Sequence, residues 1–411
     1  MVAIGKIKNK GQYDGLKCWY VLAVVLSLFD IVSRGLLSRL PFISVLSALA
    51  PIFVLICVIK TINRKSKTGF SDVSNKSLLC VFLTYNLVII IRGFIQCEDY
   101  WDVKDVFTKF GALIMPAVIF AGFRPNLYHA IFRYLITWYV LATLLLCGHV
   151  FFPVQGLPLL FVISWLFLLK RNKWYWLLVV FVFFSIYGNF GSRGWIIRVF
   201  FALGLAVVYK YFHIKEYVYK LFYVLMISLP LLFVALGYWG KFNVFAMDEY
   251  IDSNDEEMTA DTRTGLYTRV YQTLDEEDCE LFGKGAKSEY WSGFNDRLEM
   301  FKDVRKKGRS STESGLLNFY LMGGWIGGLL YSLLFWCASY LAMFKSSSQL
   351  CRFLGMFVLF RWVISFIDEP QAWFLNYMML FMGVSMCMSR YFRSLNDVEL
   401  ISWIKSFYKK A

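Results

Sequence analysis

Two arginines stand where one apolar run ends and the next begins, in residues 189–200 (NFGSRGWIIRVF). A guanidinium group stays protonated and offers a planar fork of donors that matches an anionic oxygen group. Arg193 lies at the edge of the apolar run, where it can meet such a ligand. Arg198 lies about one and a half helical turns farther in, so it also fits a structural role. The pair predicts a site that binds an anion, and Arg193 is the stronger candidate of the two for contacting it.

Two further arginines flank a short amphipathic segment, TRTGLYTRVYQTL. Leu266, Val270 and Leu274 recur at helical spacing, which predicts a short helix with one apolar side lying on a membrane surface. Arg263 and Arg269 flank that side and add two more guanidinium groups to the candidate anion site.

A glycine pair follows in LFGKGAKSEYW, where Gly283 and Gly285 bracket Lys284. The pair lacks the preceding strand and the spacing of a nucleotide-binding loop. One interpretation is a simple turn. The other is a tight turn that carries Lys284 and Lys287 toward an anionic ligand, since glycine tolerates the left-handed backbone that such turns need.

A carboxylate closes the same polar stretch, in SSTESGLLNFY. Ser310, Ser311 or Thr312 can cap the following helix, and Glu313 in its first turn is favoured by the helix dipole. Capping alone explains Glu313. The alternative is a general base that takes a proton from an attacking hydroxyl, or a group that orients an arginine or binds a sugar hydroxyl.

Arginines also occur inside apolar runs, Arg92 in VIIIRGFIQ and Arg361 in LFRWVISFIDEP. A charge near the bilayer centre costs about 2.5–3.5 kcal/mol on insertion scales. Both arginines can snorkel to the surface. Alternatively they line a basic cleft, with Asp368 or Glu369 as partners of Arg361.

The elements that must position these residues are membrane helices. The chain has 411 residues, of which 58% are hydrophobic and 19% aromatic, and its mean hydropathy is +0.53. Apolar runs of about 17 to 25 residues, the length that crosses a bilayer, recur throughout. We therefore expect an all-α membrane protein with about twelve spans: 17–34, 42–60, 77–97, 107–123, 129–152, 156–170, 173–190, 194–212, 217–240, 314–344, 352–367 and 372–389. The run 314–344 is long enough for an extra turn outside the bilayer or a glycine-rich bend.

Positively charged loops alternate with acidic or neutral loops along the chain, which predicts that both termini lie in the cytoplasm. Nine spans (1–240) precede one large periplasmic loop (241–313), three more follow (314–390), and a basic cytoplasmic tail ends the chain (391–411). The net charge of +14 gathers on the cytoplasmic side, where anionic lipids are the expected partner and nucleic acid is not needed. No cleavable signal follows the basic start. The scattered cysteines indicate neither disulfides nor a metal site.

Together these motifs resemble the O-antigen polymerase and O-antigen ligase superfamily. The similarity rests on the SRG at a helix end, the arginine-led helix in one large loop, the G-x-G and the polar residue that opens the next helix, mainly within residues 185–330. It implies a C-type, metal-independent and cofactor-free inverting glycosyltransferase of the bacterial inner membrane, active at the periplasmic face. Its substrates would be undecaprenyl-pyrophosphate-linked oligosaccharides, and a chain-length regulator is a candidate partner.

By motif position, Arg193 and Arg263 match the catalytic arginines of that family, and Glu313 stands as the candidate base. Arg198, Arg269, Lys284, Lys287, Arg92 and Arg361 are then candidate substrate-binding residues. O-antigen ligases carry a functional histidine near the end of the large loop, but His129, His149 and His213 lie elsewhere. This departure favours a polymerase of O-antigen or capsular-type polysaccharide. A ligase acting on lipid A-core and a lipid-linked oligosaccharide transporter stay as alternatives.

Overall fold

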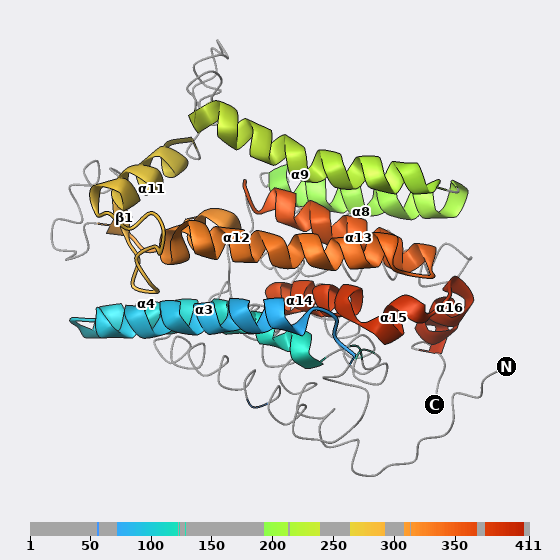
Figure 1. Ribbon diagram of the computed structural model, residues 1–411, viewed down its shortest axis with the longest axis horizontal. Coiled ribbons are helices and arrows are strands. Elements are labelled where there is room, and N and C mark those ends of the chain that lie inside the picture. The colour runs from blue at the N-terminus through green and yellow to red at the C-terminus, as the bar shows by residue number, and fades with distance from the viewer. Residues whose placement is uncertain are drawn as a thin grey trace, which may run out of the picture. The chain divides into compact units, whose positions relative to one another are not determined.

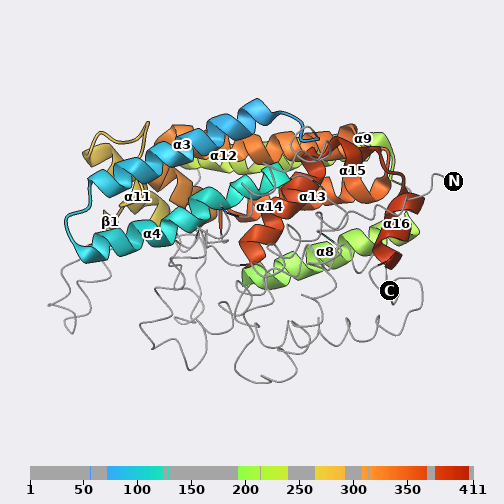
Figure 2. The ribbon, with the colours of Figure 1, turned by 90° about the horizontal axis from the view of Figure 1, so that it is seen from below.

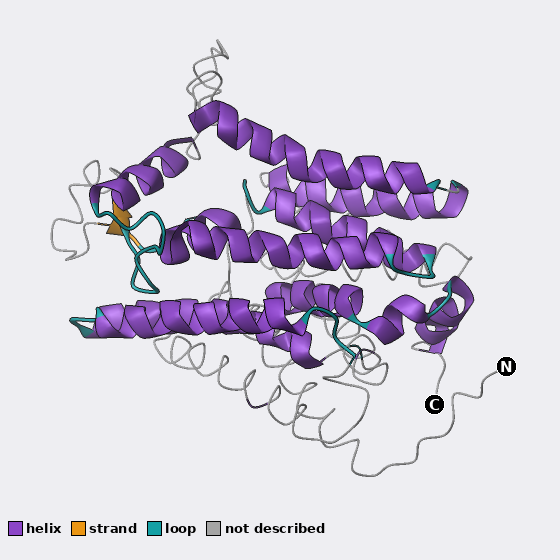
Figure 3. Ribbon diagram, viewed as in Figure 1, coloured by secondary structure: helices purple, strands orange, loops and turns teal. Residues whose placement is uncertain are grey.

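The computed structural model is predominantly helical (Figures 1 and 3). It describes residues 56, 72–121, 123, 128, 193–212, 214–238, 264–291, 308–312, 314–367 and 375–406. The expected spans 17–34, 129–152, 156–170 and 173–190 lie outside these residues, as does 42–60 except for one position. The chain divides into two compact units, residues 1–74, 115–210 and 373–411 in the first and 75–114 and 211–372 in the second.

The second unit holds most of the candidate site. Its helices are α3 (Lys76–Ile95), α4 (Tyr100–Ile114), α9 (Glu216–Tyr238), α11 (Thr264–Glu276), α12 (Gly315–Phe344) and α13 (Gln349–Ile364). Two short strands, β1 (Tyr290–Trp291) and β2 (Gly308–Arg309), pair antiparallel beside α11. The helix α12 packs on both α13 and α3.

Small side chains allow α12 and α13 to approach closely. A Cβ on Gly355 would lie 2.8 Å from the Cβ of Ala342 and 3.1 Å from the carbonyl oxygen of Ser339. Such small-residue contacts are typical of helix packing in membranes, where apolar burial does not itself drive association. Serine caps open both helices, because Ser314 Oγ accepts a bond from the amide of Leu317 and Ser348 Oγ accepts one from the amide of Cys351.

The first unit contains α8 (Arg193–Tyr211), the 3₁₀ helix η2 (Met115–Ala121), α14 (Leu375–Met388), α15 (Arg390–Ser394) and α16 (Asp397–Ser406). Figure 2 shows these helices from below. The segment before α3 joins the end of α14: Asp72 accepts bonds from Ser389 Oγ and the amide of Tyr391, and Ser74 Oγ accepts one from Arg393. The expected basic tail, 391–411, is thus helical over part of its length.

Several boundaries agree with the sequence prediction, because long apolar runs define α3, α8, α9, α13 and α14. The span expected at 107–123 is wrong. The helix α4 begins earlier, at Tyr100, and the chain changes to 3₁₀ geometry at Met115, directly before Pro116. Proline lacks an amide hydrogen and its ring clashes with the preceding turn, which favours a change of helical geometry at this point.

Two helices in the described part of the chain, α3 and α12, are long and apolar enough to cross a membrane. The helix α12 is not continuous, because Gly324 has φ 61° and ψ −159°. The glycine-rich bend expected in this run is therefore confirmed. The part after the bend, Trp325–Phe344, still measures about 30 Å, the thickness of a hydrocarbon core.

Candidate functional site

The bend at Gly324 turns the first two turns of α12 back beside the rest of the helix. The rings of Phe319 and Tyr331 stack at 4.5 Å, although twelve residues separate them in sequence. A Cβ on Gly327 would lie 2.9 Å from the carbonyl oxygen of Phe319. Only a reversal of direction can bring these groups together, since the same residues would lie about 12 to 18 Å apart along a straight helix.

A break in a helix leaves amide and carbonyl groups without intrahelical partners. The segment 279–286, here called the glycine loop, supplies hydrogen-bond partners for these groups. The amides of Trp325 and Ile326 donate to the carbonyl oxygens of Glu280 (2.9 Å) and Leu281 (3.3 Å). In the other direction, the amides of Lys284 and Gly285 donate to the carbonyl oxygens of Leu321 (3.0 Å) and Met322 (2.8 Å). The glycine loop therefore completes the broken helix.

The two glycines of the loop adopt left-handed backbone conformations, with φ 64° at Gly283 and 82° at Gly285. The predicted tight turn is thus confirmed. A Cβ on Gly283 would lie 2.4 Å from the backbone of Met322, so no other residue fits there. On the other side of the loop, the amide of Ala286 donates to the carbonyl oxygen of Ile89 in α3.

Arg92 clamps the glycine loop from the last turn of α3. Its two terminal nitrogens donate to the carbonyl oxygens of Phe282 (2.7 Å) and Gly283 (2.8 Å). The sequence leaves two roles for Arg92, snorkelling and anion binding. In the structure Arg92 lies in the last turn of α3, and both of its terminal nitrogens donate to backbone carbonyl oxygens. A Cβ on the adjacent Gly93 would lie 2.7 Å from the Cβ of Ala286, so α3 and the loop meet without a gap.

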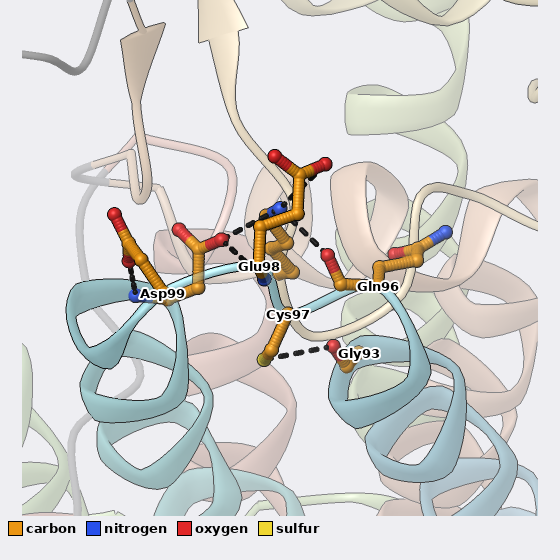
Figure 4. Close-up of polar contacts among 7 residues, drawn as sticks. Gly93, Gln96, Cys97, Glu98 and Asp99 are labelled. Carbon is orange, nitrogen blue, oxygen red and sulfur yellow. Dashed lines mark hydrogen bonds and ion pairs between the residues drawn. The ribbon is translucent and has the colours of Figure 1, made fainter.

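Lys287 follows the glycine loop and binds the turn between α3 and α4. Figure 4 shows that turn, with Gln96, Glu98 and Asp99 labelled. The Nζ of Lys287 lies 2.6 Å from Asp102 Oδ2, 2.6 Å from the carbonyl oxygen of Gln96 and 3.8 Å from Glu98 Oε1. The hydrogen bond that Lys287 donates to Asp102 raises the pKa of Lys287, and the charge of Glu98 adds to that effect. Nearby, Lys109 donates to the carbonyl oxygen of Ser288 at 2.7 Å.

Lys284 points differently from Lys287. Its Nζ pairs with Glu277 Oε1 at 2.5 Å, and the carboxylate of Glu277 is about half exposed. Ion pairs on a surface contribute little net stability, because both groups are also well hydrated when separate. Glu277 can therefore turn toward water and leave Lys284, whose side chain is 19% exposed, to an anionic ligand.

The helix α11 carries the predicted apolar side. Leu266, Val270 and Leu274 are buried, as the sequence predicts, but they pack against Tyr290, Leu317 and other residues of the protein. The expectation that this side lies on a membrane surface is therefore wrong, since α12 covers it. Arg269 is half-buried on the same helix and has an interaction partner there.

Tyr267 ties α11 to the beginning of α12. Its buried hydroxyl donates to the carbonyl oxygen of Phe366, at 2.5 Å, and lies 3.3 Å from Ser314 Oγ. Ser314 Oγ in turn donates to the carbonyl oxygen of Ser365. Burial raises the pKa of the Tyr267 hydroxyl, so it stays a neutral donor. The start of α11, the start of α12 and the end of α13 are thereby joined.

The predicted cap of α12 is wrong by two residues or more. Ser314 caps the helix, so Glu313 precedes the cap and is not in the first turn. Thr312 has another role: its amide and hydroxyl bind Asn318 Oδ1 at 2.7 and 3.0 Å, and Asn318 returns a bond to the carbonyl oxygen of Thr312. This closed pair fixes the chain that leads into the helix.

The remaining candidates are divided between the two units. Arg361 is buried in the second unit, with its guanidinium 5.9 Å from the ring centre of Phe357. Arg198 is buried in the first unit and also has partners. Arg193 begins α8, but its side chain lies outside the described residues, as do Arg263, Glu313, Asp368 and Glu369.

The sequence reasoning missed three residues of this arrangement: Asp102, Tyr267 and Gly324. Asp102 falls between the expected spans 77–97 and 107–123, although a carboxylate in a first helical turn is favoured by the helix dipole. Tyr267 adjoins Leu266 on the apolar side of α11, which was a signal for burial. The glycine-rich run GGWIGG marked the bend but not the reversal.

Within the described segments, no group of three histidine, cysteine or acidic residues is arranged to hold a metal ion. At the end of α3, Arg92 and Lys287 are hydrogen-bonded to backbone carbonyl oxygens of the glycine loop and of the α3–α4 turn. The chain matches no known protein family, no curated protein and no solved structure.

Proposed function

We propose that this chain is a membrane-embedded polysaccharide polymerase. It would join undecaprenyl-pyrophosphate-linked oligosaccharides into an O-antigen or capsular-type polymer. In this proposal the protein lies in the bacterial inner membrane with both termini in the cytoplasm, and the glycine loop faces the periplasm.

One observation carries the proposal: the contact between Tyr267 and Ser314, 3.3 Å between their hydroxyl oxygens. In sequence, Arg263 directly precedes α11, four residues before Tyr267, and Glu313 directly precedes Ser314. Chain connectivity therefore keeps an arginine and a carboxylate close to one fixed point, although 50 residues separate them in sequence. Glycosyl transfer from a pyrophosphate needs this combination of a cation and a base.

The proposed reaction is a direct displacement. The hydroxyl oxygen of the incoming repeat unit attacks the anomeric carbon of the growing glycan. The bond from that carbon to the pyrophosphate oxygen breaks, and the hydroxyl proton passes to the carboxylate of Glu313. Arg193 and Arg263 stabilise the charge that develops on the leaving pyrophosphate, as preorganised guanidinium groups can without a metal.

The other basic residues divide into two roles in this proposal. Arg92 donates to backbone carbonyl oxygens and Lys287 donates to Asp102, so both residues position the glycine loop. Lys284 and Arg269 bind the diphosphate or the glycan. Lys284 suits that role because its partner Glu277 is about half exposed, so water can replace the ion pair between them. Arg198 and Arg361 are buried, so in this proposal they support the structure around them and do not reach the substrate.

The broken helix α12 favours a second candidate, a transporter of lipid-linked oligosaccharides. Transporters commonly bind their substrates at the ends of discontinuous helices. In α12, however, loop backbone already occupies the groups freed at the break. An O-antigen ligase is the third candidate, and it differs from the polymerase in its acceptor only.

The function is tested by restoring a strain that lacks this gene with Arg193→Ala, Arg263→Ala or Glu313→Gln. We expect the glycan ladder on a gel to collapse to single repeat units. Lys220→Ala is the matched control, because it removes an exposed lysine that pairs with Glu216 on α9 and should leave the ladder intact. A ligase defect would instead leave no repeat unit attached. Normal ladders in all three variants would exclude the proposed site.

Purified protein separates the polymerase from the transporter. In detergent, where no gradient exists, a polymerase extends lipid-linked repeat units and releases undecaprenyl pyrophosphate. Transport into vesicles without any elongation would favour the second candidate.

A further inference from the structure

An apolar groove lies in the second unit between α9, α11, α12 and the residues after α13. Its lining includes Leu231, Tyr271, Tyr320, Leu329, Trp336 and Phe366, and its volume with the open mouth is about 670 Å³. The groove shares Tyr267 with the proposed catalytic site, but no step of the proposed glycosyl transfer takes place in it.

Two hydrogen-bond donors in the lining have no partner among the described residues. Tyr320 is 4% exposed, yet its hydroxyl makes no hydrogen bond within the described part of the chain, and the same holds for the buried indole nitrogen of Trp336. Neighbouring donors are satisfied: Trp362 Nε1 donates to Ser332 Oγ at 3.0 Å. Buried donors without partners are rare because desolvation is then uncompensated. The two orphaned donors therefore indicate a ligand that brings acceptors.

The mouth of the groove is apolar as well. Leu231 is 43% exposed, Trp325 is 47% exposed and Leu329 is 54% exposed. Two of these residues belong to α12, a helix apolar enough to cross a membrane. In the membrane location proposed above, a groove that opens through such side chains faces hydrocarbon, so its occupant enters from the lipid phase.

We propose that the groove binds an acyl chain of a glycerophospholipid, with an ester carbonyl accepting hydrogen bonds from Tyr320 and Trp336. The acyl chain matches the apolar lining, and the ester oxygen supplies the acceptor that both donors lack. A polyprenyl chain matches the lining equally well but has no acceptor along its hydrocarbon. The proposal is independent of the glycosyltransferase function, because the bound lipid is structural and is not consumed.

Photolabelling tests the proposal directly. The purified full-length protein is placed in nanodiscs of phosphatidylethanolamine and phosphatidylglycerol that contain a phospholipid with a diazirine in one acyl chain. Cross-linked peptides are then identified by mass spectrometry. We expect labelling within residues 316–336. A second reaction uses a diazirine-bearing polyprenyl phosphate in the same nanodiscs.

Gly328→Leu blocks the groove without crowding the fold. A Cβ at Gly328 meets no atom within 4 Å, and Gly328 lines the groove. Gly204→Leu on α8 is the matched control, since a Cβ there also meets open space but lies outside the groove. We expect Gly328→Leu to reduce labelling of residues 316–336 at least fivefold and Gly204→Leu to leave it unchanged.

The double variant Tyr320→Phe, Trp336→Phe tests the ester contact. It keeps the apolar lining but removes both donors, so phospholipid labelling should fall roughly fivefold for each hydrogen bond lost. Unchanged labelling in Gly328→Leu would overturn the groove assignment. Preferential labelling by the polyprenyl probe, or equal phospholipid labelling in the double phenylalanine variant, would overturn the acyl ester as its ligand.

Discussion

Arg92 and Gly283 are 191 residues apart in sequence, but the guanidinium of Arg92 donates to the carbonyl oxygen of Gly283 at 2.8 Å. The second terminal nitrogen binds the preceding carbonyl, that of Phe282. One side chain at the end of α3 thus holds the loop that completes the break in α12. The fork of a guanidinium suits two adjacent carbonyls in a way that a single ammonium group does not.

Arg92→Ala should lower the free energy of unfolding by about 2 kcal/mol, because two charge-assisted hydrogen bonds to backbone are lost in a partly exposed place. Arg92→Lys should cost about 1 kcal/mol, since lysine keeps the charge but reaches one carbonyl at a time. Thermal unfolding of the detergent-solubilised protein measures both.

Lys220→Ala is the control for charge, and it should change the free energy of unfolding by less than about 0.5 kcal/mol. Equal stability of Arg92→Ala and Lys220→Ala would mean that the clamp on the glycine loop does not form in the folded protein.

The reversal at Gly324 gives a second prediction. Gly324→Ala forces a Cβ to within 2.4 Å of Glu280 and Leu281 backbone atoms at φ 61°, and should cost at least about 3 kcal/mol or prevent folding. Gly328→Ala, four residues later on the same helix, meets open space and should stabilise the protein by up to about 1 kcal/mol. Yield of monodisperse protein and its unfolding temperature report both. Similar behaviour of the two variants would contradict the bend.

Tyr267→Phe should cost about 1–2 kcal/mol, because the carbonyl oxygen of Phe366 then loses its buried donor. The loss should also detach α11 from the start of α12, which limited proteolysis within residues 264–276 would detect. Tyr271→Phe on the same helix is the matched control: the Tyr271 hydroxyl makes no hydrogen bond with the described residues, so that substitution should be nearly neutral. If both variants resist protease as the parent does, the hydrogen bond of the Tyr267 hydroxyl does not determine the position of α11.

The sequence predicted the parts of this fold that depend on long local patterns. Apolar runs located α3, α9 and α13 within a few residues, and the spacing of Leu266 and Val270 located α11. These patterns are set by the interval between neighbouring side chains on one helix. The glycine pair likewise predicted a turn, because left-handed backbone has a local residue signature.

The sequence could not predict which groups meet across the chain. Lys284 and Lys287 have the same local signature, yet one pairs with nearby Glu277 and the other with Asp102, 185 residues earlier. Asp102 falls between the expected spans 77–97 and 107–123, because the first turns of α4 are too polar to match the pattern of a membrane span. Partner choice depends on tertiary packing, which no short motif records.

The contact between Lys287 and Asp102 predicts a dependence of stability on alkaline pH. The hydrogen bond to Asp102 raises the pKa of Lys287 above its ordinary value of 10.5, so the folded protein holds the proton more tightly than the unfolded chain. The stabilisation is therefore complete below pH 10.5 and is lost as the pH rises through the higher pKa of the folded state. Asp102→Asn keeps an oxygen that accepts from the amide of Glu98 but removes the charge.

We expect Asp102→Asn to be less stable than the parent by about 1 kcal/mol at neutral pH, and the difference to shrink as the pH rises above 10.5. Denaturant titrations at a series of alkaline pH values measure it. Glu216→Gln, which breaks the exposed pair with Lys220, should show no difference at any of them, because both groups of that pair are about two-thirds exposed. A gap between Asp102→Asn and the parent that stayed constant through the alkaline range would show that Lys287 keeps its proton for a reason other than Asp102. The anchoring of the glycine loop to the α3–α4 turn would then rest on the carbonyl oxygen of Gln96.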